Sequence, residues 1–128
     1  MKYYFSKTIS NSFDESVSLI TEALKTGGFG IITEIRMHDK LKEKLGVDFK
    51  KYTILGACNP SYAYEALKME DKIGTMLPCN VLVIEQEKGK VEIVAIDPVA
   101  SMLGVGNPEL SEVAGKVAET LKKIVESV

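Results

Sequence analysis

The two cysteines are the residues of this chain with the clearest chemical potential. Cys58 ends the apolar run ILGAC and directly precedes Asn59 and Pro60, whereas Cys79 lies in LPCN, directly before Asn80. Asparagine suits a helix cap and proline the first helical turn. Cys58 would then lie at a helix amino terminus, whose unpaired amides and partial positive charge stabilise a thiolate. The favoured interpretation is packing, because free cysteine is among the most buried residue types.

Whether the two thiols can meet depends on the direction of the strands that carry them. In antiparallel strands Cys58 and Cys79 would share one end of the sheet and could reach bridging distance, with a Cα separation of about 4.4–6.8 Å. In parallel strands they would stand roughly 20 Å apart, because six residues at about 3.3 Å intervene. The connector up to Pro78 could return either way, but the helix between the strands favours a parallel crossover. We therefore expect parallel strands and no redox pair.

A metal site finds little support in the sequence. Zinc requires three or four ligands, and this chain has two cysteines and a single histidine, His38, far from both. A Cys–His nucleophile would need that histidine to reach a thiol, and no local signature indicates it. We expect His38 and Asp39 to cap a short helix, and we expect neither metal nor cofactor.

Two further polar residues stand where strands or loops lead into helices. Asp97 ends a strand as a turn former or as a carboxylate directed at a pocket, and Asn107 repeats the Asn-Pro helix start. The glycine-flanked turn 103–108 could also cradle an anion, although it lacks the lysine of a P-loop. We predict that Cys58, Asn59, Asp97 and Asn107 line one ligand-binding cleft. The competing expectation is that both asparagines only cap their helices.

Hydrophobic periodicity predicts the scaffold that positions these residues. Four helices are expected: one from a Ser12–Glu15 capping box to Gly27, and others over 37–45, from 60 and from 108 to the end. Strands are expected at 2–9, 29–35, 52–57 and in a hairpin of 81–86 and 91–96. This order predicts a two-layer α+β fold, with a mixed sheet of about five strands and helices packed on one face. At 128 residues the chain is expected to form a single domain, 1–128.

The same strands predict a homodimer. The segments YTIL, VLVI and VEIVAI carry apolar residues at both odd and even positions. Because alternate residues of a strand point to opposite faces, this pattern indicates burial on both faces of the sheet. The helices can cover only one face. A second copy packed on the other face with two-fold symmetry would satisfy the pattern.

Composition excludes several classes of partner. Sixteen Lys and Arg against eighteen Asp and Glu give a net charge of −2, so there is no basic field for nucleic acid. The longest aliphatic run is far shorter than the roughly 18 residues of a membrane span, and the amino terminus is too polar for a signal peptide. We therefore expect a cytoplasmic protein with reduced cysteines, and neither nucleic acid nor membrane as a partner.

The succession KEKLGVDF, YTILGACNP, LPCNVLV and AIDP, followed by an amphipathic helix, resembles the prokaryotic family known as domain of unknown function 302. The resemblance spans nearly the whole chain. It implies a compact α+β domain, often dimeric, whose biochemical role is not established. The family's motif positions correspond to Gly56, Cys58, Asn59, Pro60, Leu77, Pro78, Cys79, Asn80, Asp97 and Pro98.

Three functions are consistent with these observations. The leading one is a non-catalytic homodimeric module that binds a small ligand or a protein partner. The alternative is a thiol-dependent enzyme or redox carrier that uses Cys58, so the sequence leaves enzymatic activity open. The third is a purely structural interaction module. The rate at which Cys58 is alkylated separates the alternative from the other two.

Overall fold

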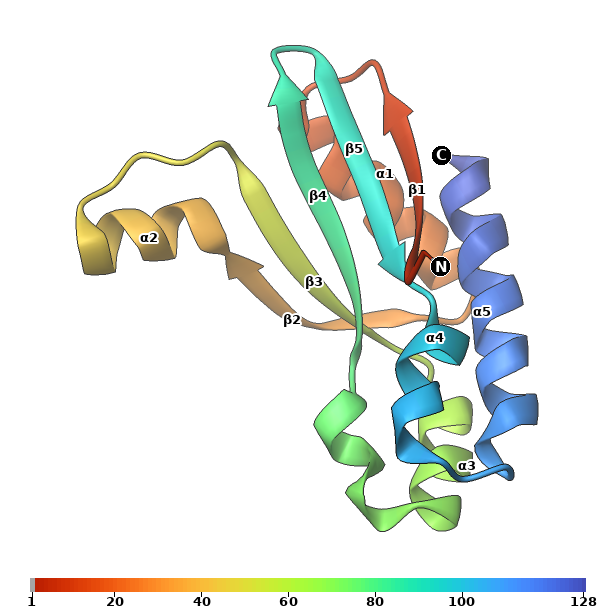
Figure 1. The fold of residues 1–128 in the computed structure, drawn as a ribbon. Helices are drawn as coiled ribbons and strands as arrows, with labels where there is room; N and C mark the ends of the chain where they lie inside the picture. Colours follow the sequence, from red (N-terminus) through yellow and green to blue (C-terminus); the bar gives the residue numbers. More distant parts are fainter. Residues whose placement is uncertain (1) are drawn as a thin grey trace.

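A computed structural model describes residues 2–128 and shows a sheet flanked by helices (Figure 1). The strands within this range are β1 Tyr4–Ile9, β2 Gly30–Arg36, β3 Tyr52–Cys58, β4 Cys79–Glu87 and β5 Lys90–Ile96. The α-helices are α1 Phe13–Thr26, α2 Met37–Leu45, α3 Pro60–Met69, α4 Pro98–Met102 and α5 Leu110–Ser127. Two short 3-10 helices, η1 Asp71–Met76 and η2 Leu103–Val105, complete the order.

The strands form one sheet in the order β1-β5-β4-β3-β2, and each adjacent pair of described strands is antiparallel. The expected mixed sheet with β3 and β4 parallel is therefore wrong. The reason is the course of the connector: α3 and η1 lie beyond the end of the sheet instead of crossing its face, and the chain turns back into β4 (Figure 1). Antiparallel pairing places Ala57 directly opposite Cys79.

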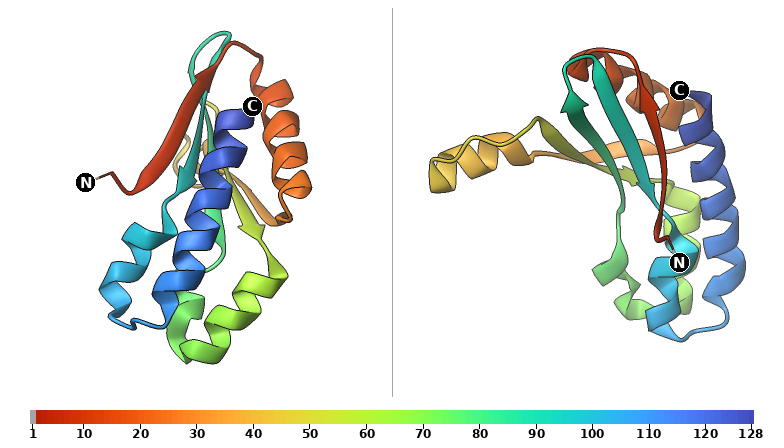
Figure 2. Two further views of the ribbon diagram at one scale, coloured as in Figure 1. Left: turned by 90° about the vertical axis from the view of Figure 1, so that its right-hand side faces the viewer. Right: turned by 45° about the horizontal axis from the view of Figure 1, so that its top comes forward.

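Helices α1 and α5 cover one face of this sheet, which confirms the two-layer α+β class (Figure 2). The capping serine predicted for α1 is present, since the Glu15 backbone amide donates to Ser12 Oγ at 3.2 Å. The core between helices and sheet includes the fully buried side chains of Ile20, Leu24, Leu55, Val81, Val83, Ile93 and Leu121. Their spacing in helices and strands is the periodicity from which these elements were predicted.

The opposite face of the sheet carries an apolar row that α1 and α5 do not reach. Paired residues share a face, and the pairing runs from Ile35 to Ile54, from Ile54 to Leu82, and from Leu82 to Val94. Ile35 is 41% exposed at the outer end of this row. The strand β2 and the helix α2, which has no buried residue, project from the body as an arm (Figures 1 and 2).

Candidate functional site: an apolar cavity at the end of the sheet

A cavity of about 330 Å³ lies where β3 ends and β4 begins. Helices α3 and α4 and the first turns of α5 contribute to its lining, and these elements gather at one end of the molecule (Figure 1). Nearly all of its lining is apolar. The lining residues are Phe29, Ile32, Ala57, Cys58, Asn59, Tyr62, Ala63, Ala66, Leu67, Leu77, Pro78, Cys79, Pro98, Met102, Leu110, Val113, Ala114 and Val117.

The start of α3 forms one wall of the cavity. Asn59 caps this helix through its side-chain oxygen, which accepts a hydrogen bond from the Tyr62 amide at 3.2 Å, and Pro60 occupies the first turn as expected. Behind the cap, Ala63 and Ala66 face the cavity. Because these side chains are small, they leave room that larger residues would fill.

Gly56 allows the strands below the cavity to pack closely. A Cβ atom at this position would lie 2.1 Å from Thr33 Oγ1 and 2.7 Å from Pro78 Cγ. Pro78 follows a cis peptide bond from Leu77 and leads directly into Cys79. The absence of a side chain at position 56 therefore lets the LPCN segment lie against β3.

Both cysteines are free and partly buried, and both line the cavity. They stand at the same end of the sheet, so the expected separation of roughly 20 Å is wrong. Burial, with a smaller contribution from the nearby Cys58, raises the pKa of the Cys79 thiol to about 11. Cys79 is therefore a neutral thiol near pH 7, because burial disfavours its charged form.

Asp97 directly precedes α4 and Asn107 lies between η2 and α5, but neither residue lines the cavity. Asp97 accepts from the Val99 amide at 3.0 Å and caps α4. Asn107 does not cap α5, which begins later than expected, at Leu110.

The Asn107 side chain instead connects its loop to the end of α3. Its amide group donates to the Met69 carbonyl oxygen and to Glu70 Oε1, each at 3.1 Å, and its own oxygen accepts from the Glu109 amide. Of the four predicted site residues, only Cys58 and Asn59 thus face the cavity. Ligand binding by the four residues stays a prediction.

Several cavity residues were not anticipated as site residues. Met102, Ala114 and Val117 belong to apolar stretches that the sequence explains as ordinary helix packing. The pattern AYEAL in α3 was the available signal. Its two alanines, Ala63 and Ala66, border the cavity.

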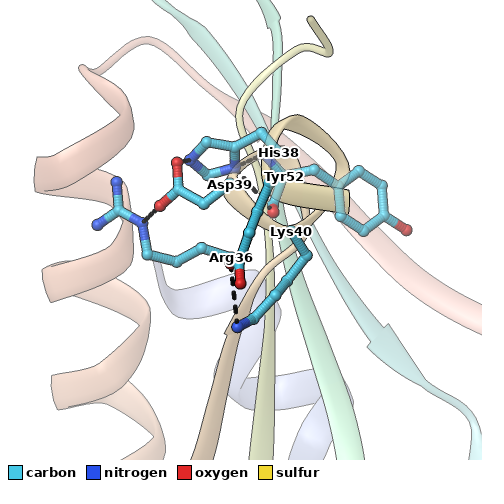
Figure 3. Close-up of polar contacts among 6 residues, drawn as sticks. Arg36, His38, Asp39, Lys40 and Tyr52 are labelled. Carbon is cyan, nitrogen blue, oxygen red and sulfur yellow. Dashed lines mark hydrogen bonds and ion pairs between the residues drawn. The ribbon is translucent and has the colours of Figure 1, made fainter. Parts of the chain in front are cut away.

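His38 lies in α2, and it is not one of the cavity residues (Figure 3). The Tyr52 backbone amide donates a hydrogen bond to the Nδ1 atom of His38 at 2.9 Å. This hydrogen bond connects α2 to the start of β3. The expectation that His38 and Asp39 cap the helix is wrong, because α2 begins at Met37 and its first turn already contains both. Asp39 pairs instead with Arg36, at 2.7 Å (Figure 3).

No helix within residues 2–128 is long and apolar enough to cross a membrane.

Comparison with known proteins agrees with this architecture. No curated protein matches the sequence. The chain is similar to a solved structure described as an uncharacterized conserved protein DUF302 from Bacillus stearothermophilus, with 29% sequence identity, a TM-score of 0.90 and 98% of each chain covered. The sequence model of the family, described as domain of unknown function DUF302, matches residues 5–128. The chain therefore belongs to the DUF302 family.

Proposed function

We propose that this protein is a homodimeric binding module that holds a small, largely apolar molecule in the cavity at the end of its sheet. The observation that carries the proposal is the cavity itself, about 330 Å³ with an apolar lining. The cavity is partly open to solvent, so a ligand can enter it. An apolar space of this size also falls at the lower end of the range of small-molecule sites.

The polar groups at the cavity suggest the form of its ligand. Asn59 uses its side-chain oxygen to cap α3, which leaves its amide NH₂ available to donate to a ligand. Tyr62, from the same helix, also lines the cavity. None of the lining residues is Lys, Arg, His, Asp or Glu. A ligand with an apolar body and one polar, uncharged end satisfies this arrangement, because a buried charge would find no partner.

The same lining favours binding over catalysis. An acid–base or Cys–His mechanism needs a titratable partner at the thiol, and His38 is instead engaged with the backbone of Tyr52. The Cys79 thiol is protonated near neutral pH. A thiol-dependent enzyme or redox carrier is therefore the less favoured function.

Filling the cavity is expected to weaken binding of an apolar probe. We expect N-phenyl-1-naphthylamine to fluoresce more strongly with the wild-type protein and to bind with 1:1 stoichiometry. Ala114→Leu places three extra carbon atoms in the cavity and should weaken this binding about ten-fold or more, equivalent to about 1.4 kcal/mol. Fluorescence titration measures the dissociation constant of each variant.

Gly115→Ala is the matched control for this experiment. It adds a methyl group to the next residue of α5, where a Cβ atom meets nothing within 4 Å, and Gly115 does not line the cavity. This variant should bind the probe like wild type. Equal binding by all three proteins would show that the probe does not occupy the cavity, and absence of binding to wild type would contradict the proposed function.

The homodimer rests on the apolar row of Ile35, Ile54, Leu82 and Val94 on the face that α1 and α5 leave uncovered. Within one chain Ile35 is exposed, Ile54 and Leu82 are half-buried, and Val94 is already buried. We expect light scattering coupled to size-exclusion chromatography to give twice the mass of 14.0 kDa at tens of micromolar. Leu82→Asp should produce a monomer, since it places a charge in the middle of the row. The control Lys88→Asp, in the exposed turn between β4 and β5, should remain dimeric. A monomeric wild type would overturn the proposed dimer.

A further inference from the structure

The chain's two cysteines border the same cavity, and binding of an apolar molecule alone gives them no role. We propose that Cys58 and Cys79 act together as a dithiol site. Its ligand is an apolar molecule whose soft central atom forms two bonds to sulfur, of the class of monosubstituted trivalent arsenicals. This proposal rests on the proposed function, because it names the ligand class of the same cavity.

The register of the strands brings the two residues close together. Ala57 lies directly opposite Cys79, and Cys58 is the next residue along β3. Opposite Cα atoms in antiparallel strands are about 4.5–5.5 Å apart and each residue advances about 3.4 Å, so the Cys58 and Cys79 Cα atoms stand about 6 Å apart. The proximity of the thiols also contributes to the raised pKa of Cys79.

The same register favours a bridging atom over a direct disulfide. Successive side chains of a strand alternate between the two faces of the sheet. At this end of the sheet the Cys58 side chain therefore starts from one face, and the side chains of the paired Ala57 and Cys79 start from the other. A disulfide requires Cβ atoms that point toward each other. Both residues nevertheless line the cavity. A single atom bonded to both sulfurs holds them farther apart than the S–S bond of about 2.05 Å in a disulfide does.

Charge and ligand number exclude some of the centres that bind two thiols. The cavity lining has no cationic side chain to neutralise an anion, and burial keeps Cys79 protonated. The complex of a monovalent cation with two thiolates would carry a negative charge, which an apolar site disfavours. Within residues 2–128, no group of three His, Cys, Asp or Glu side chains could hold a metal ion. The donor set therefore does not fit a zinc ion, which needs three or four protein ligands.

A monosubstituted arsenic(III) oxide leaves a neutral product. Two As–S bonds replace the As=O bond and the two S–H bonds, and the oxygen departs with both thiol protons as one water molecule. Arsenic remains trivalent, so no oxidant or reductant takes part. The organic substituent on arsenic would occupy the apolar remainder of the cavity, which Leu110, Val113 and Ala114 border on the side of α5.

Phenylarsine oxide is a suitable probe of this site. Reduced wild-type protein should take up one phenylarsenic group per chain, seen as a single mass increment under native conditions with loss of both free thiols. A small dithiol such as 2,3-dimercaptopropanol should reverse the reaction. Cys58→Ala and Cys79→Ala each retain one thiol and should bind the probe on the order of 100-fold more weakly, because the second attachment to the same ligand is lost.

Binding of the naphthylamine probe by the two single-cysteine variants shows that their cavities remain folded. If wild type binds that probe but takes up no arsenical, or if either variant takes it up as tightly as wild type, the dithiol site is overturned while the proposed function stands. If wild type takes up the arsenical through both cysteines but binds no naphthylamine, the dithiol site is supported and the general apolar binding function fails.

Discussion

Phe29→Ala is expected to lower the free energy of unfolding by about 3–5 kcal/mol. Phe29 is only 2% exposed and belongs both to the core beneath α1 and α5 and to the wall of the cavity. Its backbone amide donates to the Leu24 carbonyl oxygen at 2.8 Å, which closes the end of α1 and directs the ring inward. Truncation removes this buried ring and enlarges a cavity that already exists. The surrounding side chains therefore cannot move in to fill the new space.

Urea denaturation followed by circular dichroism measures this change. Phe29→Leu is the control, since it keeps an apolar side chain and should lose clearly less stability than the alanine variant. The variant Phe29→Ala, if folded, should also admit a bulkier apolar probe than wild type does. Equal stability of the alanine and leucine variants would show that the ring is not a structural support of the cavity.

Much of the fold was predictable because local chemistry and tertiary packing agree. The Ser12 cap, the apolar spacing of α1 and α5 and the hairpin turn around Gly89 each specify one local structure. Gly46 ends α2 with a positive φ angle of 68°, which glycine adopts without strain. In these segments no distant contact competes with the local preference.

The direction of β4 could not be predicted in the same way. Both a parallel crossover and an antiparallel return are compatible with a helix followed by a connector, and the choice depends on where α3 packs. In the structure Ala66, Ile73 and Leu110 form a small separate core beyond the end of the sheet. This cluster holds α3 and η1 near the start of α5, so the chain has no need to cross the sheet. Such a contact joins residues far apart in the sequence, and no local pattern reveals it.

The candidate site was predictable only where its residues lie in one motif. Cys58 and Asn59 are adjacent, so one helix start places both at the cavity. Asp97 and Asn107 carry similar capping signals, but the Asp97 side chain caps α4, whereas that of Asn107 bonds to its own loop and to the end of α3. A capping residue satisfies backbone amides first. Whether it also faces a ligand depends on the packing of its helix, which the motif alone does not specify.

The motif glycine that precedes Cys58 leads to the second large effect. Gly56→Ala is expected to destabilise the protein by about 1–3 kcal/mol, as overpacking of a well-packed site does. The new methyl group would meet Thr33 Oγ1 at 2.1 Å and Pro78 Cγ at 2.7 Å. To relieve these contacts, the Thr33 side chain must rotate, or β3 must move away from β2 or from the LPCN segment.

A double-mutant cycle with Thr33 tests this explanation. Thr33 is exposed, so Thr33→Ala alone should change stability little. The variant with both Gly56→Ala and Thr33→Ala removes the closest contact but keeps the one to Pro78. It should therefore recover part of the loss, with a coupling energy of about 0.5–2 kcal/mol. Additive effects of the two substitutions in urea denaturation would show that the Thr33 hydroxyl does not oppose a side chain at position 56. Because Pro78 leads into Cys79, the unrelieved part of the strain should also appear as weaker binding of the naphthylamine probe by both variants that contain the Gly56→Ala substitution.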